Sequence, residues 1–120
     1  MKKGLIAVLA GVLFIVFSAI FMIAADCPEK VTIDEFAKKK APVTFSHKAH
    51  ADKFGCKECH HKWDEKGTPE KCSSCHKAKK DGEKPAAKKA YHKKCKGCHK
   101  TLKKKGEKTG PTKCNDCHKK

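Results

Sequence analysis

Hydrophobic residues are concentrated at the start of the chain. Lys2 and Lys3 precede an almost unbroken apolar run from Gly4 to Ala25. A cleaved signal peptide has an apolar stretch of about 7–15 residues, whereas a membrane span needs about 20. Residues 1–25 are therefore predicted to be either a signal peptide or an N-terminal membrane anchor formed by residues 4–25. Both alternatives place residues 26–120 outside the cytoplasm as one small domain.

Residues 26–120 show no sustained amphipathic period, which predicts short helices and loops. Val31–Ile33 and Pro42–Phe45 are brief runs rich in β-branched residues, and they can pair as a two-stranded ribbon. Ser46 is a candidate N-cap for a helix that carries His47 and His50. The expected domain is therefore a small assembly of short helices and loops with one β-ribbon.

The composition of this domain does not suit an ordinary hydrophobic core. After residue 25 the chain has one Trp, one Tyr, three Phe and no Met, but 27 Lys. A domain of this size has a marginal core unless metals, disulfides or other groups stabilise it. We therefore expect something other than side chains to supply the buried apolar mass.

One unit, Cys-x-x-Cys-His, occurs four times. The copies are Cys56-x-x-Cys59-His60, Cys72-x-x-Cys75-His76, Cys95-x-x-Cys98-His99 and Cys114-x-x-Cys117-His118. In this motif the two thiols attach covalently to haem, and the histidine becomes the first axial ligand of the iron. A random chain of this composition would contain about 0.07 such motifs. The motifs therefore predict four covalently attached haem c groups.

Two other uses of the cysteines fit the sequence less well. Structural zinc sites also use Cys-x-x-Cys pairs, but they do not require a histidine directly after every second cysteine. A disulfide scaffold is common in exported chains, but the nine cysteines form an odd set. Cys27 lies outside the motifs. Because Ala24-Ala25-Asp26 is a poor lipobox, a free or intermolecularly paired Cys27 is favoured over a lipidated one.

The histidine count matches four six-coordinate irons. Four histidines belong to the motifs, and four others remain: His47, His50, His61 and His92. No Met follows Met22, so the usual alternative ligand is missing. The pattern predicts low-potential haems with two histidine ligands each. His60 and His61 are adjacent and should serve different irons, whereas His47 and His50 share one face of a helix.

The segment from Pro42 to His50, with the pattern Pro-Val-Thr-Phe-Ser-His-x-x-His, is followed by Cys56-x-x-Cys59-His60-His61. This arrangement resembles the tetrahaem cytochrome c3 family, the class III c-type cytochromes. The resemblance implies a small multihaem fold wrapped around four haems, with Phe45 packed near the first. It also implies four ligand pairs: His47 with His60, His61 with His76, His50 with His99, and His92 with His118. Many members have four residues between the cysteines of two motifs, whereas all four motifs here have two.

The resemblance further implies a periplasmic electron carrier and no enzyme. Its partners would be a periplasmic hydrogenase or formate dehydrogenase and membrane redox complexes. A membrane-anchored quinol-oxidising tetrahaem cytochrome is the alternative, and a multihaem reductase would need one iron without its second histidine.

Charge indicates where such partners would dock. Residues 26–76 carry 10 Lys against 9 acidic residues, whereas residues 77–120 carry 17 Lys against 4. A field of this kind steers acidic proteins, and the exported location excludes nucleic acid as the partner. We expect docking near the fourth motif, beside Lys100, Lys103, Lys104, Lys105, Lys113, Lys119 and Lys120.

Overall fold

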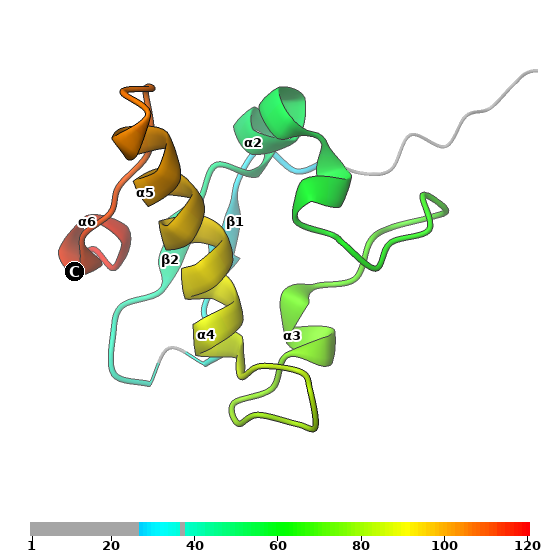
Figure 1. Ribbon diagram of the computed structural model, residues 1–120. Helices are drawn as coiled ribbons and strands as arrows, with labels where there is room; N and C mark the ends of the chain where they lie inside the picture. The colour runs from blue at the N-terminus through cyan, green and yellow to red at the C-terminus, as the bar shows by residue number, and fades with distance from the viewer. Residues whose placement is uncertain (1–26, 37) are drawn as a thin grey trace, which may run out of the picture.

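The computed structural model describes residues 27–36 and 38–120 (Figure 1). The predicted signal peptide or anchor lies outside these residues. Within the part of the chain that is described, no helix is both long and apolar enough to cross a bilayer.

The expected β-ribbon is present. Strand β1 (Val31–Ile33) pairs antiparallel with β2 (Val43–Phe45), and Val31 lies opposite Phe45 in the register. Pro42 lies just before β2 and not within it, because proline has no N–H to donate to a ladder. The ribbon places the segment that follows Phe45 at its end, where the first histidine-bearing helix begins.

Helix α2 (His47–Phe54) begins after Ser46, as predicted, although the Ser46 hydroxyl does not bond to a backbone amide of the first turn. That hydroxyl lies 3.4 Å from Nδ1 of His50 instead. The helix ends at Gly55, whose φ of +78° is a conformation that glycine adopts without strain. This turn places Cys56 directly after the helix.

Three of the four Cys-x-x-Cys-His motifs form single helical turns. They are η1 (Cys56–Glu58), a 3₁₀ turn, together with the short α-helices α3 (Cys72–Cys75) and α6 (Cys114–Cys117). In each case the motif histidine follows one turn after the first cysteine, so that both cysteines and the histidine stay close together.

The remaining motif lies inside a helical run that is longer than the sequence predicts. Helices α4 (Ala87–Tyr91) and α5 (Gly97–Lys104) are joined without a break by η2 (His92–Lys96), one turn of π-helix, and the three form one rod in Figure 1. The individual helices are short, as predicted, but the sequence did not predict that these three join into one continuous run. Alanine and lysine favour helix throughout this stretch, and the π turn disrupts the amphipathic period that would reveal it.

The described residues have almost no hydrophobic core of their own. Ala87 is the only one of them that is buried, with 1% of its surface exposed, whereas Phe54 is 41% exposed. No buried polar residue is present among them either. The elements of Figure 1 are thus arranged without the packed side chains that normally hold such elements together.

Candidate functional site

Three of the four motif histidines are fixed by the backbone of their own motif. In three motifs the backbone N–H of the histidine donates to the carbonyl of the first cysteine, one helical turn earlier. These bonds join His60 to Cys56 (2.9 Å), His76 to Cys72 (2.8 Å) and His118 to Cys114 (2.9 Å). The repeated bond gives the three motifs one shared local conformation.

The eight histidines form four pairs in the structure. Every pair joins one motif histidine to one of the other four. The ring centres are 6.1 Å apart for His47 and His60, 6.2 Å for His61 and His76, 6.2 Å for His50 and His99, and 6.5 Å for His92 and His118. These are the same combinations that the resemblance implies. The adjacent residues His60 and His61 lie in different pairs.

A second regularity concerns the ring nitrogens. Nδ1 of each motif histidine lies within hydrogen-bond distance of a backbone carbonyl, which can only accept. The acceptors are Glu70 for His60 (3.0 Å), Pro85 for His76 (2.9 Å), Pro111 for His99 (2.7 Å) and Ala41 for His118 (2.7 Å). Nδ1 must therefore carry the proton, and Nε2 keeps its lone pair for a metal.

Comparison with known proteins identifies the family. The sequence model of the class III cytochrome c family matches residues 22–118. The chain belongs to this family. The predicted family and the predicted fold class, a small multihaem cytochrome with short helices and a two-stranded sheet, are thereby confirmed.

Individual relatives agree with this assignment. Cytochrome c3 from Desulfovibrio desulfuricans is 59% identical over 39 residues, which are 31% of this chain and only 37% of that protein. Cytochrome c3 from Desulfuromonas acetoxidans is 42% identical over 55 residues, 36% of this chain and 74% of that protein. The crystal structure of the di-tetraheme cytochrome c3 from Desulfovibrio gigas superposes with a TM-score of 0.62 at 36% identity, and the match covers 78% of this chain and 97% of that one.

Class III cytochromes carry covalently bound haem c, and the residues of this chain fit that group. A metal–imidazole bond is about 2.0 Å long and the ring centre lies about 1.2 Å further out, so the centres of two rings that bind one iron from opposite sides would be about 6.4 Å apart. All four histidine pairs have this spacing. The near absence of buried side chains also fits a chain whose apolar interior is supplied by haem.

The same geometry does not suit zinc. A structural zinc ion needs four protein ligands in a tetrahedron. Among residues 27–36 and 38–120, no three His, Cys, Asp or Glu side chains gather as ligands for one metal ion. Histidines that come together only in pairs suit a metal whose other ligands come from a macrocycle.

Burial favours the neutral form of some of the motif thiols. Desolvation by neighbouring protein atoms raises the pKa of Cys95 to about 11, although part of its surface reaches solvent. Burial raises the pKa of Cys59 and Cys72 in the same way. Zinc-bound cysteines are thiolates. The surroundings of Cys59, Cys72 and Cys95 thus favour the neutral thiol over the thiolate.

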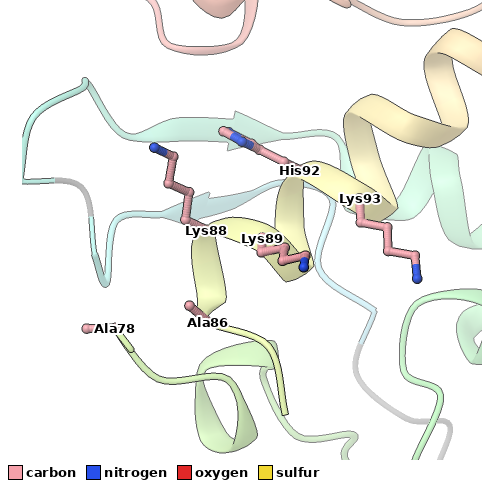
Figure 2. Close-up of a pocket in the computed structure, with 6 residues that line it drawn as sticks. All are labelled: Ala78, Ala86, Lys88, Lys89, His92 and Lys93. Carbon is pink, nitrogen blue, oxygen red and sulfur yellow. The ribbon is translucent and has the colours of Figure 1, made fainter. Parts of the chain in front are cut away.

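His92 has surroundings that favour its neutral form. Burial lowers its pKa, and the positive charges of Lys88 and Lys96 lower it further. Figure 2 shows Lys88 and His92 on the same side of the helix, beside a hollow that Ala78 and Ala86 also line. A neutral imidazole is the state that binds a metal.

The π turn determines the direction of His92. His92 and His99 are seven residues apart, a spacing that would place them about 20° apart on one face of an α-helix. The π turn adds one residue to a single helical turn, marked by the bond from Gly97 N–H to the His92 carbonyl. The His92 ring consequently pairs with the His118 ring, whereas the His99 ring pairs with the His50 ring.

Several contacts near these pairs were not predicted from the sequence. Gly110 lies against the His99 ring, since a Cβ there would be 2.6 Å from Cε1 of the imidazole. Nζ of Lys94, in the π turn, donates to Glu58 of the first motif over 2.6 Å. Sγ of Cys27 lies 3.7 Å from Nδ1 of His47. The only feature of the sequence that draws attention to Gly110 is that it directly precedes Pro111.

Proposed function

We propose that this class III cytochrome carries four haem c groups, each iron held by two histidines, and that it serves as an electron carrier. The four histidine pairs with one common ring spacing are the observation that supports this most strongly. In this proposal His60, His76, His99 and His118 are the first ligands. His47, His61, His50 and His92 are the second ligands, in that order.

Covalent attachment uses the cysteines of the four motifs. They are Cys56 and Cys59, Cys72 and Cys75, Cys95 and Cys98, and Cys114 and Cys117. One helical turn brings each pair close together, and in the first, second and fourth motifs the histidine that follows is held by its backbone bond to the first cysteine. When bound, haem iron supplies one-electron oxidation and reduction.

The chain itself supplies ligands and surroundings for this chemistry. The two histidines of each pair would hold one iron and would leave it no position for a substrate, and histidine in place of methionine would favour a low potential. No catalytic residue is proposed for this reason. The family match favours such a carrier over the quinol-oxidising alternative.

Replacing the second histidine of each pair tests the ligand assignment. Changing His47, His61, His50 or His92 to Ala, one at a time, should leave four attached haems and convert one iron to a five-coordinate state that binds carbon monoxide. The wild-type protein should bind none. Carbon monoxide binding by the unchanged protein, or retention of four low-spin irons in all four variants, would contradict the assignment.

We also propose a periplasmic location and an acidic redox protein, such as a hydrogenase or formate dehydrogenase, as the partner. The chain has a formal charge of +16 before haem is counted, and most of the excess lies in residues 77–120. Lys100, Lys103 and Lys104 line one hollow with Thr112, on α5 and the segment before α6. This lysine surface suits an acidic face.

Charge reversal at this surface tests the docking proposal. Changing Lys103, Lys104 and Lys105 together to Glu should slow electron transfer to an acidic partner at low salt, and the difference from wild type should shrink as salt is added. Changing Lys38, Lys39 and Lys40 to Glu alters the net charge equally and is the matched control. Equal slowing in both variants would contradict a docking face near the fourth motif.

A further inference from the structure

The chain has five prolines, and each stands at or directly beside a residue whose carbonyl accepts a hydrogen bond from Nδ1 of a proposed iron ligand. Three prolines are the acceptors themselves: Pro28 for His47 (3.1 Å), Pro85 for His76 (2.9 Å) and Pro111 for His99 (2.7 Å). In the other two cases the acceptor is Ala41, just before Pro42, for His118, and Glu70, just after Pro69, for His60. Each proline is associated with a different histidine, and no histidine is associated with two prolines.

Proline has a physical reason to stand at these positions. Its ring fixes φ near −65° and removes the N–H, so the direction of the nearby carbonyl is restricted before folding. The residue before a proline is held in an extended conformation by the same ring. A restricted carbonyl loses less conformational entropy when it accepts a hydrogen bond than a carbonyl on a flexible loop.

This chain needs such restriction more than an ordinary domain does. Only Ala87 among the described residues is buried, so side-chain packing does little to fix the loops that carry the acceptors. The hydrogen bond at Nδ1 determines which ring nitrogen faces the metal, how the ring is rotated and how basic it is. If the loop that carries the carbonyl were flexible, the tautomer, the rotation and the basicity of the histidine ring would no longer be fixed.

The Pro85 segment shows how such a carbonyl is held. The preceding turn is closed by backbone bonds in both directions between Asp81 and Lys84, of 3.1 and 2.8 Å. The following residues are anchored where Ala87 N–H donates to the Lys77 carbonyl over 2.8 Å. Pro85 stands between these two anchors, and its carbonyl meets Nδ1 of His76.

We propose that the five prolines are positioning residues, each of which holds a carbonyl that fixes the tautomer and rotation of one iron ligand. This inference rests on the ligand assignment proposed above. His50 is a natural control, because its Nδ1 donates to Ser46 at the start of its own helix, over 2.8 Å, and no proline is adjacent.

The test uses the full-length, haem-loaded protein with ¹⁵N-labelled histidine in its reduced, diamagnetic state. In Pro85→Ala the exchange of the Nδ1 proton of His76 with solvent should accelerate about tenfold, because the acceptor opens more often. Exchange at His50 and at the other ligands should stay within error of wild type. Lys79→Ala, an exposed change in the same loop, should leave every ligand unchanged.

Pro111→Ala provides a second, independent case, with faster exchange expected at His99 alone. Unchanged exchange at His76 in Pro85→Ala, or equal acceleration at all ligands, would overturn the positioning role. Unchanged exchange at His99 in Pro111→Ala would overturn it as well. This variant tests the positioning role if the Pro85 variant does not bind haem. Low-spin spectra of the wild-type protein report the ligand assignment separately, so failure of that assignment is distinguishable from failure of the proline inference.

Discussion

At the scale of single residues, the His99 ring has little free space on the side of Gly110. A Cβ at position 110 would lie 2.6 Å from Cε1 and 2.9 Å from Nε2 of this imidazole. Gly110→Ala should therefore push His99 away from its partner His50 and convert one iron from low spin to high spin. The overpacking should also lower the free energy of unfolding by about 1–3 kcal/mol. Magnetic circular dichroism and chemical denaturation measure the two effects.

Gly97→Ala is the matched control for this change. A Cβ at Gly97 meets only the His92 carbonyl, at 3.9 Å, which is an ordinary contact. Alanine is favoured over glycine in a helix by about 1 kcal/mol, so stability should be unchanged or slightly raised. Four low-spin irons in Gly110→Ala, or a high-spin iron in Gly97→Ala, would show that contact with Gly110 does not position His99.

The identities of the proposed ligands could be predicted from the sequence, but their surroundings could not. Cysteine and histidine at a fixed short spacing identify the haem-attachment residues and the first ligand from the motif alone. The carbonyl that faces His118 belongs to Ala41, 77 residues earlier in the chain. Such a contact depends on how the segment before β2 lies beside the residue that follows α6, and no local pattern encodes it.

At the scale of elements, the π turn η2 accommodates one extra residue between His92 and His99. The two side chains, seven residues apart, therefore have the relative direction that a spacing of six residues gives in a regular α-helix. Deleting Lys93 should therefore produce a regular α-helix in which both histidines keep their directions. Inserting one Ala after Lys93 should instead rotate His92 by about 100° relative to His99. We expect four low-spin irons in the deletion variant and one high-spin iron in the insertion variant.

Resonance Raman spectra of the two variants, which report spin state, give a direct comparison. Loss of one low-spin iron in the deletion variant would mean that the π turn does not correct the register. Four low-spin irons in the insertion variant would also show that the π turn does not correct the register.

The β-ribbon and the start of α2 could be predicted because β-branched runs and a serine at the boundary of a helix are local signals, although the Ser46 side chain does not form the capping bond. The rod from Ala87 to Lys104 could not, because the π turn shifts the face on which later residues appear. A search for a single 3.6-residue period therefore divides this helix into unrelated pieces.

At the scale of the whole molecule, the lack of buried side chains predicts that the chain depends on haem for folding. Only Ala87 is buried among the described residues, so the chain without haem buries too little apolar surface to offset its conformational entropy. We expect chain produced without haem attachment to lack most of the helical circular dichroism of the loaded protein and to show no cooperative melting. A cooperative thermal transition in the haem-free chain would contradict this dependence.

The central claim, four haems with two histidine ligands each, is tested most directly on one sample of the purified wild-type protein. Intact mass spectrometry counts the attached groups, and low-temperature magnetic circular dichroism of the same sample counts the low-spin irons. The four motifs and four histidine pairs predict a mass increase of four haem groups and four low-spin irons per chain. Fewer than four attached haems, or any high-spin iron in the unaltered protein, would contradict the account.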